Sequence, residues 1–218
     1  YDKAYTRAYT TEVVQGKHGV KITSHASVVA ETVQKILDVT ITWKIEAAGK
    51  IDADIAVTKD DEFPDLPRFG VRMFLDKKLS AVRYFGMGPQ ESYCDKHQAA
   101  SHGLYQANVD DLHEDYIRPQ ENGSHYDCEY VELNNSRYGI VVSAENAFSF
   151  NASYYTQEEL EEKTHNYELT ESDSVVFCVD YALNGIGSNS CGPVVLEQYR
   201  FDDVLFRFQF TLIPYVKG

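Results

Sequence analysis

The sequence predicts an all-β fold, a large antiparallel β-sandwich with one short helix, and three observations support this prediction. Apolar and polar residues alternate with period two in several runs, among them 39–45, 51–57 and 204–212, which places the apolar side chains on one face of a strand. Turn-forming residues separate the runs without intervening helices, as is typical of antiparallel sheets. Only one segment carries the start signal of a helix.

The expected strands follow one another along the chain. The runs 39–45 and 51–57 flank the turn Ala48-Gly49-Lys50 and predict a hairpin. Pro64 and Pro67 keep the backbone extended ahead of the next strand. Further strands are expected at 69–75, 126–130, 138–144, 148–150, 175–179 and 204–212.

One helix and one irregular region complete this prediction. Thr156 and Glu159 have the spacing of a capping box, in which the Thr hydroxyl and the Glu carboxylate bind the first free N–H groups. We therefore expect a short helix that ends near Lys163. Residues 92–124 show little periodicity and predict a long irregular segment. No linker, repeat or low-complexity tract interrupts the chain, which predicts a single domain over residues 1–218.

The composition argues against several classes of protein. A net charge of −14 would repel the phosphates of nucleic acid, and no run of about 18 apolar residues predicts a membrane span. The four cysteines form no CxxC pair, which argues against a zinc site and favours reduced thiols in the cytoplasm. The start Tyr1-Asp2-Lys3 does not resemble a signal peptide, and we expect a chain cut from a longer one.

The residues Gly86, Gly88 and Pro89 predict a sharp, rigid turn. Glycine permits backbone angles that other residues avoid, and Pro89 fixes its own φ and restricts Gly88. A proline at this position also prevents the glycines from opening a helix that could bind phosphate. We expect the turn to carry Glu91, and a second rigid turn to carry Glu121.

Several blocks of sequence, in a fixed order, resemble one family of enzymes. The blocks are Leu66-Pro-Arg-Phe-Gly-Val-Arg72, Gly86-Met-Gly-Pro-Gln-Glu91, Tyr116-Ile-Arg-Pro-Gln-Glu-Asn-Gly123, Phe150-Asn-Ala-Ser-Tyr-Tyr-Thr-Gln-Glu-Glu-Leu160 and Gly185-Ile-Gly187. Together they resemble the C-terminal domain of the lac-operon-type β-galactosidases of glycoside hydrolase family 2, which is a separate small chain in some bacteria. The resemblance implies a supersandwich of the galactose-mutarotase type, with the catalytic carboxylates on an upstream TIM barrel.

The resemblance also implies what this chain contributes to such an enzyme. No catalytic residue is expected within it. Relatives carry a Trp of the active-site wall where this chain has Cys191, so Asn189, Ser190 and Cys191 are expected to line the rim of the substrate pocket. Mg²⁺ and Na⁺ are expected in the complete enzyme, with no metal or cofactor in this region. The expected partners are the catalytic portion and, through it, a galactoside such as lactose; self-association into homo-oligomers is a further expectation.

Alternative interpretations remain for individual residues. Glu91 and Glu121 could form the carboxylate pair that retaining glycosidases need, about 5 to 5.5 Å apart, or each could bind backbone N–H groups of its own turn. Trp43 could offer a ring to a sugar, although its alternating strand favours the core. A group of histidines lacks metal-ligand spacing and is expected to face solvent or lie in turns: His97, His102, His113 and His125.

Two other classes of function also remain open at this stage. A free-standing carbohydrate-binding sandwich would expose an aromatic platform and bind sugar by itself. An assembly module would bind the catalytic portion without reaching the pocket. The residues alone do not choose between these alternatives and the enzyme domain.

Overall fold

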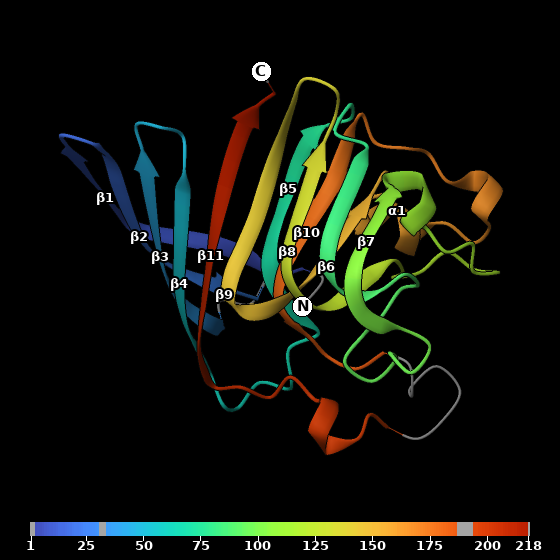
Figure 1. Cartoon of the computed structure of the whole chain (residues 1–218). Coiled ribbons are helices and arrows are strands. Elements are labelled where there is room, and N and C mark those ends of the chain that lie inside the picture. The colour runs from blue at the N-terminus through green and yellow to red at the C-terminus, as the bar shows by residue number, and fades with distance from the viewer. Residues whose placement is uncertain (1–2, 31–33, 187–193, 218) are drawn as a thin grey trace.

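The computed structural model describes residues 3–30, 34–186 and 194–217, and it confirms the all-β antiparallel prediction (Figure 1). The strands are β1 (Tyr5–Gly16), β2 (Gly19–Val29), β3 (Lys35–Glu46), β4 (Ile51–Lys59), β5 (Arg68–Asp76), β6 (Ala81–Gly88), β7 (Ser101–Asn108), β8 (Ser124–Asn134), β9 (Tyr138–Ser153), β10 (Ser174–Leu183) and β11 (Leu205–Val216). The helix α1 spans Gln157–Glu162, and 3₁₀ turns occupy η1 (Val109–Leu112), η2 (Asn166–Glu168) and η3 (Glu197–Tyr199). No helix in these ranges has the length and hydrophobicity to cross a membrane.

The long strand β9 is the branch point of the sheet. The main path runs β1-β2-β3-β4-β11-β9-β8-β6-β7, and β10 lies between β9 and β5. Residues 138–143 of β9 pair with β11, whereas residues 149–153 pair with β10. The sheet therefore divides at β9 into two wings, as Figure 1 shows. One wing consists of β1, β2, β3, β4 and β11, and the other consists of β5 and β10.

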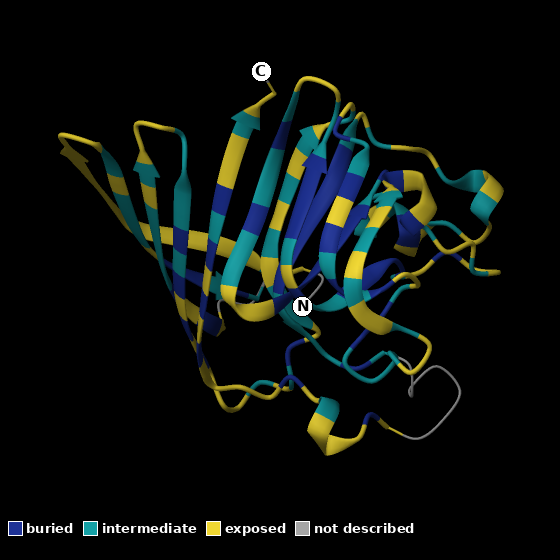
Figure 2. Cartoon of the chain, viewed as in Figure 1, coloured by how far each residue is buried: buried dark blue, intermediate teal, exposed yellow. Residues whose placement is uncertain are grey.

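The apolar faces of the two wings pack against each other and form much of the core. The Phe206 ring of β11 lies 5.0 Å from Phe69 of β5 and 4.8 Å from Tyr181 of β10, between ring centroids. Burial is greatest in the central strands, whereas β1 is exposed along its whole length (Figure 2). A largely apolar hollow of about 540 Å³ remains between β2–β4 and β5. The two-layer packing agrees with the predicted sandwich.

The alternating runs are confirmed as strands, because each becomes part of β3, β4, β5, β8, β10 or β11. Trp43 is partly buried and packs edge-on to Phe210 at 6.2 Å, as expected for the core. The runs 138–144 and 148–150, predicted as separate strands, form the single strand β9. The polar residues between them do not end β9, because residues 138–143 before them pair with β11 and residues 148, 150 and 151 after them pair with β8.

The prediction of an irregular segment over 92–124 is wrong in part, because this region contains β7 and η1. Among the described strands, β7 pairs with β6 alone and forms one end of the sheet path. Its inward positions include Gly103 and Ala107, while Leu104 is exposed. The usual contrast between an apolar and a polar face is therefore weak, and periodicity did not reveal the strand.

The predicted capping box is confirmed in one half only. The Thr156 hydroxyl accepts a hydrogen bond from the N–H of Glu159 at 3.1 Å and begins α1. The Glu159 carboxylate does not return to Thr156; its Oε1 accepts from the N–H of Thr170 at 2.8 Å. The tertiary partner replaces the local one, so the side chain ties α1 to the segment that precedes β10.

Gly86 and Gly88 must be glycines because a Cβ would not fit at either position. Their backbone angles do not require glycine, which corrects the reason that the sequence suggested. Both residues end β6, and neither has a positive φ. A Cβ on Gly86 would lie 2.3 Å from Cys128 Sγ, and one on Gly88 would lie 2.2 Å from the Tyr84 hydroxyl. The chain turns only after them, at Pro89.

Candidate functional site

Two turns with the same Pro-Gln-Glu sequence contact each other where β6 ends and β8 begins. The first turn, residues 89–91, follows β6, and the second, residues 118–123, precedes β8. The N–H of Gly123 donates to Glu91 Oε2 at 2.8 Å, which joins the second turn to the first. Two segments distant in sequence thus form one polar cluster.

Glu91 is held by donors from the segments around both turns. Its Oε1 accepts hydrogen bonds from Lys96 Nζ and from the Tyr116 hydroxyl, and Lys96 also donates to Tyr116 at 2.6 Å. Burial acts to raise the pKa of Glu91, but the bonds from Lys96, Tyr116 and Gly123 outweigh it and hold the pKa below its usual range. Glu91 is therefore an ionised, fully engaged carboxylate at neutral pH.

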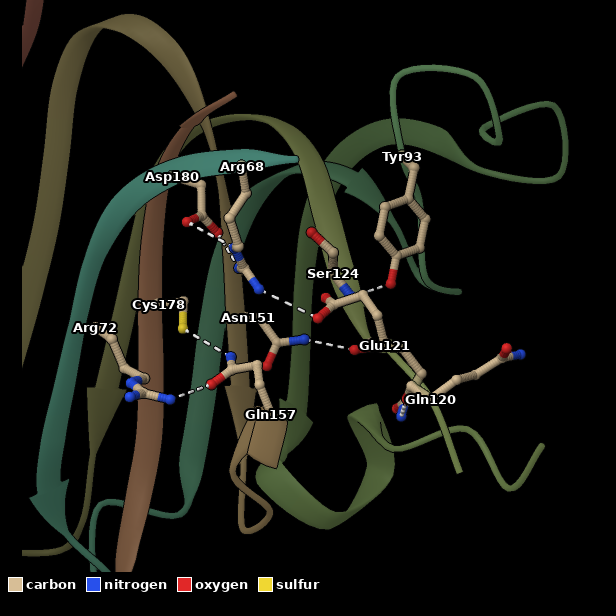
Figure 3. A network of polar contacts seen from close by, with 12 residues as sticks. Arg68, Arg72, Tyr93, Gln120, Glu121, Ser124, Asn151, Gln157, Cys178 and Asp180 are labelled. Atoms are coloured by element: carbon tan, nitrogen blue, oxygen red, sulfur yellow. Dashed lines mark hydrogen bonds and ion pairs between the residues drawn. The ribbon is translucent and has the colours of Figure 1, made fainter. Parts of the chain in front are cut away.

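Glu121 belongs to a second group, in which one cation serves two carboxylates (Figure 3). Arg68, the first residue of β5, donates from Nη2 to Asp180 Oδ2 at 2.5 Å and from Nη1 to Glu121 Oε2 at 3.1 Å. Arg68 Nε also lies 3.3 Å from Asp180 Oδ1, so the guanidinium binds Asp180 through two nitrogens. The Asp180 side chain is only 2% exposed.

The charges of this group do not balance, because two acids share one guanidinium. Burial raises the pKa of Glu121, and Arg68 only partly opposes the effect. Burial likewise raises the pKa of Asp180. Burial alone would lower the pKa of Arg68, but Asp180 and Glu121 raise it above its ordinary value. Within the described residues, Glu121 Oε1 is buried without a hydrogen-bond partner.

The two predicted turn carboxylates therefore serve as internal ligands of the fold. Both oxygens of Glu91 accept hydrogen bonds, and Glu121 binds Arg68. A glycosidase pair needs one carboxyl group to donate a proton and another to attack the sugar across a cleft. These contacts instead favour the structural interpretation of both residues.

The polar network continues from β10 to the helix α1, as Figure 3 shows. Gln157 accepts a hydrogen bond from Arg72 Nη1 at 2.8 Å and donates to Cys178 Sγ at 3.3 Å. Nearby, Asn151 Nδ2 donates to the carbonyl of Asn122 at 2.5 Å, which fixes the second turn on β9. The strands β5, β9 and β10 thus hold the turns in place.

The histidines and cysteines lie in separate places. Across the described ranges, no group of three or more His, Cys, Asp or Glu side chains could hold a metal ion. His125 was expected in solvent or a turn, but it is 1% exposed beside Phe150, and burial lowers its pKa to about 4. Cys94, Cys128 and Cys178 are free thiols, and burial raises the pKa of Cys94 to about 11 and that of Cys178 to about 12. These thiols are protonated at neutral pH.

The predicted pocket rim, Asn189, Ser190 and Cys191, lies outside the described residues. The chain on either side is described, and it borders a hollow of about 320 Å³. Aromatic side chains are prominent in the lining of this hollow: Tyr93, Tyr126, Phe148, Tyr181, Tyr199 and Phe201. Polar side chains also line the hollow, including Asp127 and Asp203.

Sequence reasoning missed the cations that bind the two turn carboxylates. Arg68 stands 53 positions from Glu121 and 112 from Asp180, and no local pattern links these residues. One signal was present: Asp180 is a single charge directly after the apolar run 175–179, where an unpaired carboxylate would be costly. Lys96 lies in the region predicted to be irregular, and no sequence pattern around it indicates that it binds a carboxylate.

The fold and the site define an antiparallel β-sandwich protein with two charged turns, one bound by Arg68 of β5 and the other by Lys96 and the N–H of Gly123. Comparison with known proteins then identifies the family. The chain belongs to the family described as beta galactosidase small chain, whose model matches residues 2–212.

Individual relatives are similar to this chain over nearly its whole length. The β-galactosidase of Actinobacillus pleuropneumoniae is 48% identical over 98% of this chain and 21% of its own length. That of Staphylococcus xylosus is 35% identical over 97% of this chain and 21% of its own. The chain thus spans about a fifth of these relatives. A GalM/aldose epimerase homologue from C. elegans has a TM-score of 0.44 at 9% identity, over 96% of this chain and 69% of that one.

Proposed function

We propose that this chain is the non-catalytic C-terminal domain of a cytoplasmic β-galactosidase. In this proposal it packs on the catalytic portion and completes the rim of the active site with Asn189, Ser190 and Cys191. The family match over residues 2–212 carries the proposal, together with relatives about five times longer than the chain. The complete enzyme would cleave terminal β-D-galactosides such as lactose with retention, using two carboxylates outside these 218 residues.

The contacts of the turn carboxylates support the non-catalytic part of the proposal. Glu91 is bound by Lys96, Tyr116 and Gly123, and Glu121 shares Arg68 with Asp180. Both oxygens of Glu91 are bound, and the unpaired Oε1 of Glu121 is buried, so neither carboxylate offers an exposed oxygen for proton transfer to a sugar. The Mg²⁺ and Na⁺ expected in the complete enzyme belong, in this proposal, to sites outside this region.

Hydrolysis of a chromogenic β-galactoside tests the proposal directly. The chain alone, the catalytic portion encoded with it, and the two together are assayed at equal concentration. We expect no turnover by the chain alone and full turnover by the complete enzyme. Turnover by the chain alone that Glu91→Gln or Glu121→Gln abolishes would reject the non-catalytic role.

The rim is tested in the complete enzyme with two substrates. The leaving group of lactose is a sugar, whereas the leaving group of an aryl galactoside is a small aromatic alcohol. Ser190→Ala and Cys191→Ala are expected to change the ratio of kcat/KM for the two substrates several-fold, because rim residues touch the leaving group. An unchanged ratio in both variants would reject the rim while leaving the domain assignment intact.

The aromatic hollow favours a second candidate, a carbohydrate-binding sandwich. Tyrosine rings and carboxylates lie together in a space of about 320 Å³, and sugars bind to such combinations of apolar faces and acceptors. Calorimetry of the chain with galactose and with lactose separates the two candidates. Heat of binding in the absence of the catalytic portion would favour this second function.

A further inference from the structure

Strand β1 is an open edge of the sheet. It is the first strand of the sheet path, and among the described strands it pairs with β2 alone. All twelve of its residues are exposed (Figure 2). Its outer edge therefore presents backbone N–H and C=O groups that no described strand pairs. An unpaired edge of this length can receive a strand of another polypeptide.

Strand β1 also lacks most of the features that keep an edge strand from pairing. Natural edges often carry Lys or Pro for this purpose, and β1 contains neither. Its register with β2 shifts once, between Ala8 and Thr10, and its charged residues are Arg7 and Glu12. The edge strands β5 and β7 are shorter, with nine and eight residues. Among the described edges, that of β1 is therefore best suited to receive a strand.

One face of the wing that begins with β1 is apolar and loses its cover toward β1. Directly paired residues of neighbouring strands point to the same face, so Val13, Ile22 and Trp43 form one row. The row continues through Ala53 to Phe210, which are each 3% exposed. Ile22 and Trp43 are partly buried, whereas Val13 is 63% exposed. The other wing thus covers the central strands and leaves this face of β1 bare, in agreement with the spread of β1–β4 in Figure 1.

The hollow of about 540 Å³ between β2–β4 and β5 lies on this same face. Alternate residues of a strand share one face, so Val28, which lines the hollow, points to the same side as Ile22. Thr6 of β1 pairs with Val28 and also lines the hollow. An uncovered apolar face that adjoins a hollow is typical of a surface that packs against another polypeptide.

The opposite face of β1 is different, because it continues a row of charged residues. Val14 pairs with Lys21, Lys21 pairs with Lys44, and Lys44 pairs with Asp52. Val14 is 61% exposed, so it matches Val13 in residue type and exposure. The two valines therefore report on two faces of one strand, of which only the face of Val13 is apolar.

We propose that β1 is the docking surface for the catalytic portion, which adds a strand to its free edge and covers the apolar face at Val13. The inference rests on the proposed function, in which the catalytic portion precedes this chain and joins it ahead of β1. Relatives are about five times longer than the chain, and the family match includes β1. A second copy would instead bring together two chains of net charge −14, which repel each other.

Amide hydrogen exchange of β1, measured in the complete enzyme and in the chain alone, tests the inference. Pairing protects backbone N–H groups, so we expect exchange in β1 to be slower in the complete enzyme by a factor of about ten or more. Strand β3 is the internal reference, because it is already paired with β2 and β4, and its exchange should change much less. Equal exchange of β1 in the two proteins would overturn the inference.

Val13→Asp and Val14→Asp form a matched pair of variants on opposite faces. In the complete enzyme, Val13→Asp places a charge in the covered face, and we expect it to return exchange in β1 toward the rate of the chain alone. Val14→Asp places its charge beside Lys21 and should leave the exchange unchanged. Val13→Thr keeps the branched shape and should give a smaller shift in the same direction, which tests the inference even where Val13→Asp does not fold. Equal effects at positions 13 and 14 would count against it.

The outcomes separate this inference from the proposed function. If the complete enzyme is active, the chain alone is inactive and β1 exchanges equally in both, the proposed function stands and docking through β1 is rejected. If the chain alone hydrolyses a galactoside and β1 gains no protection, both are rejected. Sedimentation of the chain alone tests the other occupant. A dimer that Val13→Asp dissociates and Val14→Asp retains would assign the surface to a second copy and overturn the inference.

Discussion

The two Pro-Gln-Glu turns share their sequence but differ in the charges around them. Glu91 accepts hydrogen bonds from Lys96, Tyr116 and Gly123, and these hold its pKa below the usual range. Glu121 competes with Asp180 for Arg68, and burial raises its pKa. The same tripeptide therefore gives a well-satisfied anion in one turn and an under-compensated anion in the other.

The difference shows that a motif can determine the backbone of a turn without determining its electrostatics. Both turns have a proline that restricts φ before the glutamate. The donors, however, come from outside the turns. Arg68 lies in β5, and Lys96 lies in the segment between β6 and β7. Four predictions follow from this contrast, and each can be measured on the 218-residue chain through the fluorescence of its single Trp43 during urea unfolding.

The largest effect is expected from Arg68→Met. The substitution leaves Asp180 and Glu121 without their shared cation, and breaking a buried ion pair on one side costs about 3 to 5 kcal/mol. Arg118→Met is the control, because Arg118 is an exposed residue of the second turn. The free energy of unfolding of this control should change by less than about 0.5 kcal/mol. A similarly small change for Arg68→Met would contradict the importance of the shared cation.

Gly123→Ala is expected to be the next most damaging change. Gly123 has a φ of +70°, and a Cβ there would lie 2.3 Å from the carbonyl oxygen of Leu112. Strain and overpacking together should cost roughly 2 to 4 kcal/mol, and the displaced N–H would weaken the bond to Glu91. Gly16→Ala meets only an ordinary contact and serves as the control. Equal stability of both variants would show that the second turn adapts freely.

Glu91→Gln and Glu121→Gln test the contrast itself. Glu91→Gln removes the negative charge and turns one acceptor oxygen into an NH2 group that faces a donor, and it should cost about 1.5 to 3 kcal/mol. Glu121→Gln removes one of two anions that share Arg68, so we expect a change within about 1 kcal/mol of zero. The difference in urea midpoint between the two variants measures the contrast. Equal losses, or a larger loss at Glu121, would contradict it.

The smallest effect is an opposite dependence on pH. The folded pKa of Glu91 is lowered, so its contribution to stability is present above the unfolded value of about 4.3 and is lost as the pH falls through the folded pKa. The folded pKa of Glu121 is raised, so its contribution is present below that unfolded value and is lost as the pH rises through the folded pKa.

Unfolding free energies from about pH 3 to pH 7 check the sign. The advantage of the wild type over Glu91→Gln should shrink as the pH falls. The stability of Glu121→Gln relative to the wild type should improve as the pH rises. Because Asp180 shares Arg68 with Glu121, the measured step belongs to the pair of acids. Parallel pH profiles for the two variants would contradict the opposite shifts.

Local patterns predicted most of the strands but left several elements unidentified. Period-two runs identified β3, β4 and β11, and Thr156 identified the start of α1. Strand β7 was missed, because its Gly103 and exposed Leu104 leave no clear apolar face. The joining of two runs into β9 also depends on pairing with β8, β10 and β11, which no local pattern contains.

By itself, the sequence determined the all-β class, the presence of turns at Pro89 and Pro119 and the family resemblance, because strand periodicity, proline geometry and ordered motifs are local properties of the chain. Only the tertiary structure decided the partners of each charge. Arg68 meets Asp180 across 112 positions because β5 and β10 are neighbours, and Asp95 meets Ile186 across 91. Ion pairs and pKa shifts depend on distance and burial, which arise only when strands remote in sequence are packed together.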